Sequence, residues 1–356
     1  MNPFRPRSRA LRRTSRLALA LAAAGTLLAA TGCSSGSGGS DSDAKGLKTV
    51  TLALDWTPNT NHTGIYVAQQ LGWFKKAGIN LKIVPYGSTA PETLIANHKA
   101  DFGISYQEGV TTARAAGQDI TSVFAVTQKT DVTIAVSAKR DDITSPEDLD
   151  GKTYAGFGAP YEKPLLQSVI KNAGGKGTFK TVTLNTSAYA ALYAGKADFA
   201  MPMPTWEGLE AKLTGKPLKD FQLSDYGFPE IYSTLVASSD QYLKGNSATA
   251  KKFLSVVQRG YTYAADHPAK AADLLIDANK SVLTNTELVK ESEQMLADSY
   301  YRAADGSIGT QSAARWKAFA DFEYRAGLLS DADGKKLTSA PDTSTFFTDA
   351  YLPGQK

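Results

Sequence analysis

The stretch that decides the expected fold runs from residue 55 to residue 66. It consists of Asp55-Trp56-Thr57-Pro58-Asn59-Thr60-Asn61-His62-Thr63-Gly64-Ile65-Tyr66. It follows an alternating apolar run, Val50, Leu52 and Leu54, which is typical of a strand. Asn59 supplies a capping side chain for a helix that continues through Ile65. The stretch is therefore a strand-to-helix turn, and such turns form the ligand site of an open α/β sheet.

A leader peptide precedes this stretch. Its arginines lie ahead of an apolar run over residues 17–30, which is the pattern of a secretory signal peptide. Ala30-Thr31-Gly32-Cys33 resembles a bacterial lipobox, so we expect cleavage before Cys33 and lipidation of Cys33. An ordinary cleavage site beside a bystander cysteine is the alternative. Arg12-Arg13 leaves both Sec and twin-arginine export open. Residues 33–46, rich in Ser, Gly and Asp, predict a flexible tether.

Composition excludes several classes of function. The six leader arginines account for more than the formal net charge of +4, so the mature part carries −2 and has no basic patch for nucleic acid. Cys33 is the single cysteine, so no disulfide and no thiolate metal site is expected. The three histidines, His62, His98 and His267, are far apart in the sequence. We therefore expect neither a metal nor a cofactor.

The mature part, roughly 310 residues, is long enough for two lobes. Lys99-Ala100-Asp101-Phe102-Gly103 recurs as Lys196-Ala197-Asp198-Phe199-Ala200, each time between a helical pattern and an apolar strand. Tyr106-Gln107-Glu108 follows the first copy and Thr205-Trp206-Glu207 the second. We expect both loops at the carboxyl ends of strands, facing one cleft. Chance similarity between two helix-to-strand joints is the alternative.

Alternating strand and helix patterns continue along the chain. Strands are expected over residues 81–84 and 132–136, a helix from Pro91, and a capped helix start at Ser145. Glycines at 156 and 158 predict either a backbone contact to a ligand or only a tight turn. Aromatic residues of the helices after Ala250 are assigned to packing. Crossings near residues 136–139 and 236–238 would form a hinge. The predicted organisation is a signal peptide (1–32), a tether (33–46), lobe 1 (47–137 and 238–356) and lobe 2 (138–237).

These motifs resemble one family, the solute-binding proteins of ABC importers related to those that capture thiamine pyrimidine precursors. Residues 54–68 resemble the opening block of that family, and Gly72-Trp73-Phe74 follows it. Residues 156–162 are similar to its second glycine turn, and Trp206-Glu207-Gly208 to its Trp-Glu segment. The resemblance implies an α/β type 2 periplasmic-binding-protein fold, with two Rossmann-like lobes joined by a two-strand hinge. Relatives bind aminopyrimidines, riboflavin precursors, alkyl sulfonates or nitrate.

Residue chemistry favours the aminopyrimidine among these ligands. A flat heterocycle needs aromatic faces, for which we select Trp56, Tyr106, Tyr189 and Trp206. A carboxylate opposite the amino group and the ring nitrogen forms a two-point hydrogen bond, and Glu207 is assigned this role. Asn59 and His62 would bind the substituents, with Asp55 or Glu108 as a second acceptor. An anion would instead require Arg, Lys or several N–H donors.

Each of these residues also has a purely structural interpretation. Asp55 and Asn59 are typical helix caps, and His62 fits a cap or a buried histidine. Trp56 fits a core position at a lobe edge, Tyr189 fits the core or the solvent-facing side of an alanine-rich helix, and Glu207 fits a surface acid.

The expected protein is an extracytoplasmic, lipid-anchored and monomeric substrate-binding protein without enzymatic activity. Its partners would be a heterocyclic ligand, the ABC permease and ATPase subunits, and the membrane through the lipid anchor. A receptor for riboflavin or its precursor, or for an alkyl sulfonate, is the alternative ligand class. A pyrimidine synthase of thiamine biosynthesis resembles the same family but carries a cysteine-rich iron-binding segment, for which this sequence has no counterpart. A surface receptor that signals without transport also remains open.

Overall fold

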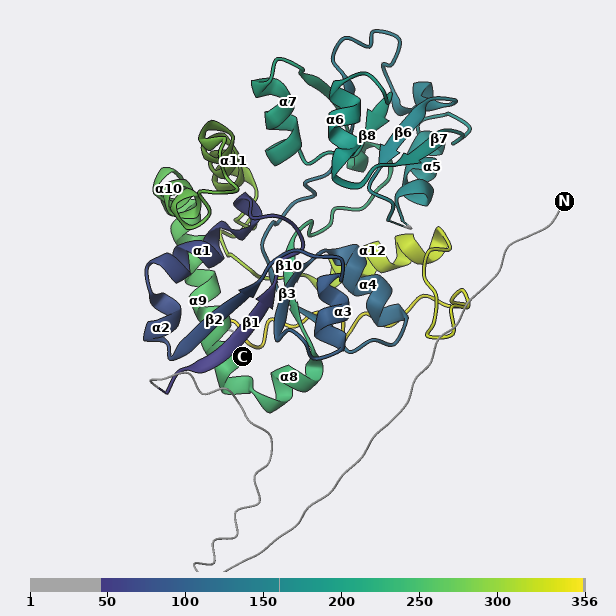
Figure 1. The fold of residues 1–356 in the computed structure, drawn as a ribbon. Helices are drawn as coiled ribbons and strands as arrows, with labels where there is room; N and C mark the ends of the chain where they lie inside the picture. Colours follow the sequence, from purple (N-terminus) through teal and green to yellow (C-terminus); the bar gives the residue numbers. More distant parts are fainter. Residues whose placement is uncertain (1–45, 160, 355–356) are drawn as a thin grey trace, which may run out of the picture. The chain divides into compact units, whose positions relative to one another are not determined.

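A computed structural model describes residues 46–159 and 161–354 of the chain (Figure 1). The predicted signal peptide, Cys33 and most of the tether lie outside the described residues. No helix in the part of the chain that the structure describes has the length and apolar character needed to cross a membrane.

In the described part of the chain, ten strands form two five-stranded sheets. The first sheet has the order β2-β1-β3-β10-β4. Its strands are β1 (Lys48–Ala53), β2 (Ile79–Val84), β3 (Phe102–Ser105), β4 (Thr121–Ala125) and β10 (Leu235–Ser238). The second sheet has the order β7-β6-β8-β5-β9. Its strands are β5 (Thr133–Ser137), β6 (Thr153–Gly156), β7 (Lys180–Thr183), β8 (Phe199–Ala200) and β9 (Leu218–Gln222). The predicted α/β fold with two similar sheets is confirmed.

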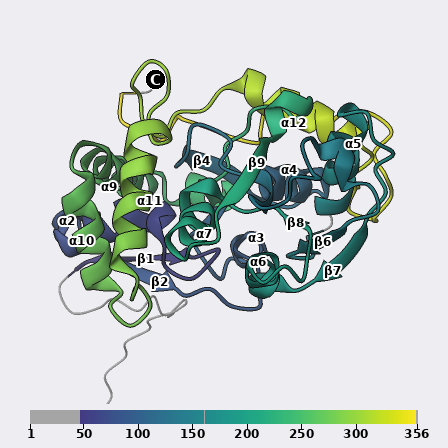
Figure 2. The same ribbon diagram turned by 90° about the horizontal axis from the view of Figure 1, so that it is seen from above.

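The first sheet is covered on both faces because side chains of a strand alternate in direction. Val236 of β10 packs with α1 (Thr63–Gln70), α2 (Trp73–Lys76) and α9 (Ser247–Asp266). Its neighbours Leu235 and Ala237 pack with α3 (Pro91–Ala96), α4 (Gln107–Ala115) and α12 (Ala313–Arg325). Two layers of helices therefore enclose this sheet (Figures 1 and 2).

The five-residue repeat occupies equivalent positions in the two sheets. Its first copy leads into β3 and its second copy into β8. In the first sheet, Asp101 accepts a hydrogen bond from the backbone N–H of Thr51 in β1, at 2.7 Å. In the second sheet, Asp198 accepts one from the backbone N–H of Thr153 in β6, at 2.8 Å. The repeated aspartate thus fixes the start of β3 to β1 in the first sheet and the start of β8 to β6 in the second.

The remaining helices complete the two groups. Around the second sheet lie α5 (Glu162–Asn172), α6 (Ala188–Tyr193) and α7 (Leu209–Leu213), with short turns η2 (Pro146–Leu149), η3 (Asn185–Ser187), η4 (Pro204–Gly208, a π-helical turn) and η5 (Leu223–Tyr226). After β10 come α8 (Asp240–Gly245), α10 (Pro268–Ala278) and α11 (Thr286–Ser299), and η1 (Thr60–His62) precedes α1. The helix predicted at Ser145 is the single turn η2, with the expected capping box. Helix α12 packs Trp316 against the first sheet and Phe319 against the core of the second.

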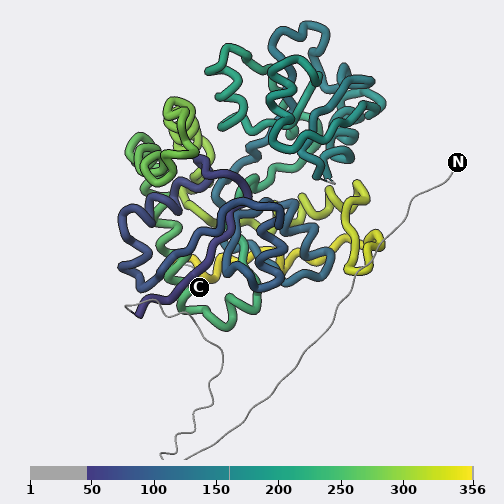
Figure 3. The backbone as a smooth tube through the Cα atoms, in the orientation of Figure 1, coloured from purple at the N-terminus to yellow at the C-terminus, as the bar shows by residue number. Residues whose placement is uncertain are grey.

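The chain passes between the sheets earlier than predicted. It crosses between Ala125 and Thr133, and returns between Gln222 and Leu235 (Figure 3). The predicted crossings, near residues 136–139 and 236–238, instead lie in or directly beside β5 and β10. The apolar pattern of these strands identifies them as strands, but it does not show which sheet each one joins.

Candidate ligand-binding site

Asp55 lies at the centre of a buried polar cluster beyond the carboxyl end of β1. Its Oδ1 atom is 2.8 Å from Nε2 of His62, and its Oδ2 atom accepts a hydrogen bond from the hydroxyl of Tyr106, which directly follows β3. Burial alone would raise the pKa of Asp55, but the contacts with His62 and Tyr106 outweigh it and hold the pKa below its usual value. The structure thus brings together three of the predicted site residues, from two neighbouring strand ends.

Asn59 and His62 form the cap of η1. The Asn59 side chain accepts a hydrogen bond from the Asn61 N–H at 2.9 Å, and the Asn59 N–H donates to Nδ1 of His62 at 3.3 Å. Because Nδ1 accepts this bond, Nε2 is the ring nitrogen that donates to Asp55. His62 is fully buried. Both ring nitrogens are therefore engaged within the protein, and His62 positions Asp55 rather than facing a ligand substituent.

Helices from the C-terminal third hold this turn in place. The hydroxyl of Tyr261 in α9 donates to the Asn61 carbonyl at 2.6 Å, and Tyr301 donates to the Thr60 carbonyl at 3.1 Å. Glu293 of α11 accepts a hydrogen bond from the hydroxyl of Thr63 at 2.5 Å and is fully buried. The assignment of Tyr261 to packing alone was therefore incomplete, since its ring lies in the core and its hydroxyl bonds to the turn.

In the second sheet, Glu162 holds the predicted glycine turn. Its two carboxylate oxygens accept hydrogen bonds from the backbone N–H groups of Phe157 and Gly158, each at 3.1 Å. Gly158 has a φ of 104°, a conformation that favours glycine. The N–H groups that would attract an anionic ligand are thus already bound to a carboxylate. The tight-turn interpretation of these glycines is the one that the geometry supports.

Glu207 lies in η4, buried among polar groups of the second sheet. Its Oε2 atom accepts a hydrogen bond from the Met203 N–H at 3.0 Å. The neighbouring Thr205 hydroxyl donates to Asp131, on the first crossing segment, at 2.6 Å. Burial raises the pKa of Glu207 to about 7 and that of Asp131 to about 8. Glu207 is therefore a buried acid, not the surface acid of the alternative interpretation.

Aromatic contacts connect the two sheets. The Trp56 ring lies 5.4 Å from the ring of Tyr86, which follows β2, and 5.3 Å from that of Phe157, which follows β6. Trp206 is half-buried and packs against the apolar cluster of α10 and α11. Tyr189 of α6 is half-buried, and its pKa is raised by burial and by the negative charges of Glu207 and Glu162. Trp56 and Tyr189 thus lie among the site groups, whereas Trp206 contributes to packing between elements.

Glu108 is the remaining predicted site residue and lies in the first turn of α4. Burial raises its pKa to about 7, although contact with Tyr161 of the second sheet's helical layer lowers it. Its Oε2 atom is buried and has no hydrogen-bond partner among the described residues. Glu108 therefore lies at the junction of the two sheets with unused hydrogen-bonding capacity.

No basic side chain compensates these acids. Among the described residues, no Lys or Arg forms an ion pair with Asp55, Glu108, Asp131, Glu162 or Glu207. In the same part of the chain, no group of three or more His, Cys, Asp or Glu side chains is arranged to hold a metal ion. Such a site suits a ligand that donates hydrogen bonds or carries positive charge.

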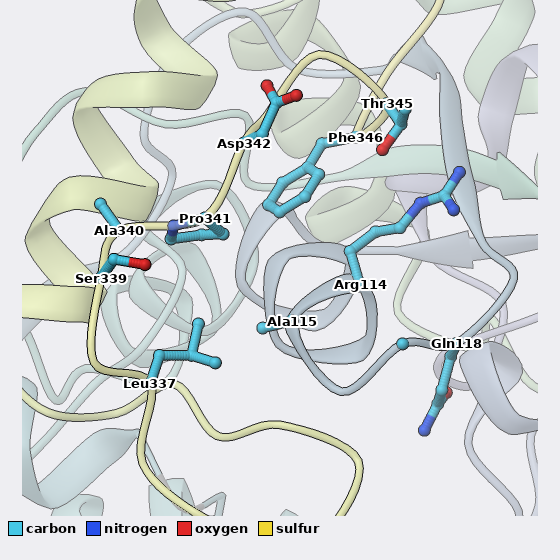
Figure 4. Close-up of a pocket in the computed structure, with 11 residues that line it drawn as sticks. Arg114, Ala115, Gln118, Leu337, Ser339, Ala340, Pro341, Asp342, Thr345 and Phe346 are labelled. Atoms are coloured by element: carbon cyan, nitrogen blue, oxygen red, sulfur yellow. The ribbon is translucent and has the colours of Figure 1, made fainter.

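A separate surface pocket lies away from these residues. It has a volume of about 380 Å³ and lies between the end of α4 and residues 337–346 (Figure 4). Arg114 lies at its edge and is paired with Asp240 at 2.8 Å. None of the predicted site residues lines this pocket.

Sequence reasoning did not select Tyr86, Asp131, Phe157 or Glu162. Tyr86 and Phe157 each follow a strand by one or two residues, which is a usable signal. Glu162 lies at the start of a helix directly after a glycine turn, where a carboxylate caps free N–H groups. Asp131 lies in a crossing segment without a motif, so nothing in the sequence distinguishes it from an ordinary loop residue.

Comparison with known proteins places these features in context. A model of the "NMT1/THI5 like" family matches residues 59–271. The formylaminopyrimidine-binding protein of Halalkalibacterium halodurans is 29% identical over 285 residues, covering 78% of this chain and 84% of that protein. A 4-amino-5-hydroxymethyl-2-methylpyrimidine phosphate synthase of Saccharomyces cerevisiae is 24% identical over 318 residues, covering 85% and 87%.

Solved structures show the same fold at low sequence identity. The alkanesulfonate-binding protein SsuA from Xanthomonas axonopodis pv. citri, bound to MOPS, superposes with a TM-score of 0.61. It is 16% identical, and the match covers 85% of this chain and 97% of that one. The fold of the chain is therefore that of periplasmic binding proteins.

Proposed function

The chain belongs to the NMT1/THI5-like family, and from that premise we propose that it captures an aminopyrimidine precursor of thiamine for an ABC importer. The ligand binds between the two sheets, beside Asp55, Trp56 and Tyr106 of the first and Glu207 and Tyr189 of the second. The protein releases the ligand unchanged to a permease, and Cys33 anchors it to the outer surface of the membrane. Binding of the ligand draws the two groups of elements together.

The observation that carries this proposal is the set of buried acids that, among the described residues, form no ion pair with a Lys or Arg side chain. An aminopyrimidine donates N–H bonds to carboxyl oxygens, whereas a sulfonate or nitrate would be repelled by them. Glu162 also occupies the N–H groups that an anion would need. The chemistry of the site therefore favours the pyrimidine over the sulfonate bound by more distant structural relatives.

A binding protein is favoured over a synthase. His62 is the histidine that lies among the site residues, and its two ring nitrogens bond to Asp55 and to the Asn59 backbone. A histidine that is consumed in a synthase reaction must have its ring accessible to the co-reactant, whereas both ring nitrogens of His62 are bonded within the protein. The single cysteine, Cys33, also leaves no cysteine-rich segment for iron.

A ligand panel tests the proposal. We expect thermal unfolding of the leader-free protein to shift upward with hydroxymethyl-, aminomethyl- or formylaminomethyl-pyrimidine, and not with taurine, nitrate or riboflavin. Saturation at about 100 times the dissociation constant adds roughly 2.7 kcal/mol to stability. A shift with taurine or nitrate alone would contradict the assignment of the acids to the ligand. Turnover of a bound pyrimidine, followed by mass spectrometry, would contradict a binding role.

Glu207 provides a residue-level test. When Glu207 is protonated, its carboxyl group donates a hydrogen bond to the ring nitrogen of the aminopyrimidine and accepts one from the amino group. Glu207→Ala is therefore expected to weaken binding by about 1 to 3 kcal/mol, as measured by calorimetry. Wild-type affinity should fall above pH 7, because deprotonation removes the donor, and Glu207→Gln should bind without this pH dependence. Glu287→Gln, an exposed position in α11, is the control. Unchanged affinity in Glu207→Ala would exclude Glu207 from the site.

A further inference from the structure

A small, partly open cavity lies where α4, α5 and α12 meet, and two carboxyl groups line it. Its volume is about 30 Å³. Glu108 and Glu323 supply the carboxyl groups, Tyr161 lies beside them, and most of the other lining side chains are apolar, including Phe228, Phe319 and Phe322. The cavity thus combines an apolar wall with a pair of acids, contributed by elements of both sheets and by the C-terminal segment.

Both acids have an oxygen atom without a partner. The Oε2 atoms of Glu108 and Glu323 are buried, and neither makes a hydrogen bond within the described part of the chain. Glu323 is 1% exposed. A buried polar atom without a partner costs about 1 to 3 kcal/mol, so such atoms are rare in folded proteins unless a ligand satisfies them.

The cavity adjoins the proposed pyrimidine site. Glu108 is two residues from Tyr106, whose hydroxyl bonds to Asp55. Tyr161 interacts electrostatically with both Tyr106 and Glu108. Glu108, the second acceptor predicted from the sequence, therefore lies in the wall of the cavity and close to Tyr106 in the chain.

We propose that this cavity is the subsite for a protonated primary amine on the ligand, so that the preferred substrates are aminopyrimidines with an aminomethyl substituent. This inference rests on the proposed function and specifies the substrate class of the same site. An ammonium group donates to both unpartnered oxygens, and its short methylene packs against the apolar wall.

Size and charge both favour this substituent. An ammoniomethyl group has two heavy atoms, and a cavity of about 30 Å³ accommodates roughly that number. A hydroxymethyl group has one proton for two acceptors, and a formylaminomethyl group is about twice as large. Burial raises the pKa of both Glu108 and Glu323, and the negative charge of Glu108 raises the pKa of Glu323 further. When an ammonium group binds beside Glu108, the carboxyl releases its remaining proton to the solvent, and the resulting carboxylate pairs with the ammonium.

The test compares three pyrimidines by calorimetry at pH 7 and constant ionic strength, with Glu323 variants. We expect the wild-type protein to bind the aminomethyl compound at least about tenfold more tightly than the hydroxymethyl and formylaminomethyl compounds. Glu323→Leu should reduce this ratio to near one, and Glu323→Gln, which keeps the shape but not the charge, should reduce it less. Asp321→Asn on the same helix is the matched control and should leave the ratio unchanged.

The outcomes separate the two proposals. If all three pyrimidines bind without an aminomethyl preference, or if neither Glu323 variant changes the ratio, the amine subsite is wrong and the pyrimidine site stands. If no pyrimidine binds, the proposed function fails and the subsite with it. If Glu323→Leu does not fold, the affinity ratio between the aminomethyl compound and the other two pyrimidines in Glu323→Gln decides the test.

Discussion

Replacement of Gly260 by alanine is expected to destabilise the protein by more than about 3 kcal/mol or to prevent folding. Gly260 in α9 faces Gly64 in α1, and a Cβ at residue 260 would overlap the carbonyl oxygen of Gly64. A Cβ at Gly64 would in turn lie 2.5 Å from Cγ of Tyr261. The two backbones are in direct contact, so an added methyl group forces the helices apart. Overpacking costs about 1 to 3 kcal/mol where the neighbouring side chains can shift. At Gly260 the neighbour is backbone, which shifts less readily, so we expect a larger cost.

Urea unfolding measures this effect. Gly245→Ala is the control, because a Cβ at this position in α8 has no atom within 4 Å. We expect the control to change stability by less than about 0.5 kcal/mol. Alanine at residue 260 with near wild-type stability would show that α1 and α9 separate easily. Because α1 begins directly after His62, a folded Gly260→Ala protein should also bind its ligand more weakly.

Glu293→Ala is expected to cost about 3 kcal/mol of unfolding free energy. The fully buried carboxyl of Glu293 accepts a hydrogen bond from Thr63 at 2.5 Å, and its Oε1 atom lies 3.1 Å from the Tyr301 hydroxyl, whose proton it shares with the Thr60 carbonyl. Alanine leaves both hydroxyls without this acceptor and opens a cavity. Chemical unfolding of Glu293→Ala beside Glu287→Ala, an exposed position on the same helix, measures the loss. A cost below about 1 kcal/mol would contradict the role of Glu293 in holding the turn.

Glu293→Gln keeps the shape of the side chain but cannot titrate, so it isolates the effect of Glu293 protonation on stability. Burial raises the pKa of Glu293 to about 8, whereas in the unfolded chain it is about 4.3. Between these values the native state binds more protons than the unfolded state, so the free energy of unfolding falls as pH rises. The glutamine variant should be close to wild type at neutral pH and should lose less stability between pH 5 and pH 8. An identical slope in both proteins would contradict the raised pKa.

Local sequence patterns predicted the individual helices and strands better than they predicted which strands pair with one another. Alternation identified β1 and the capping residues identified η1, because both depend on residues close in sequence. The equivalence of Asp101 and Asp198 was visible as a repeat. The predicted positions of the two crossings between the sheets were wrong. The residues of β5 and β10 identify them as strands but do not indicate which sheet each strand joins.

The surroundings of the candidate site were predictable only in part. Asp55 and Tyr106 lie just beyond β1 and β3, as expected for an open α/β sheet, and their contact with a ligand stays a prediction. The bonds from Tyr261, Glu293 and Tyr301 to the turn at residues 60–63 were not predicted, because they join segments about 200 or more residues apart. Side chains on long amphipathic helices show only a packing pattern, and a hydroxyl at the end of a core tyrosine does not alter that pattern.

Strand β10 lies between β3 and β4, although β4 ends at Ala125 and β10 begins at Leu235. During synthesis, β3 and β4 therefore each have one edge without its partner strand until β10 is made, about a hundred residues later. Such long-range pairing slows folding and leaves the nascent chain open to holding chaperones. A polypeptide that completes its first sheet this late stays incompletely folded until residue 238, two thirds of the way along the chain, has been synthesised.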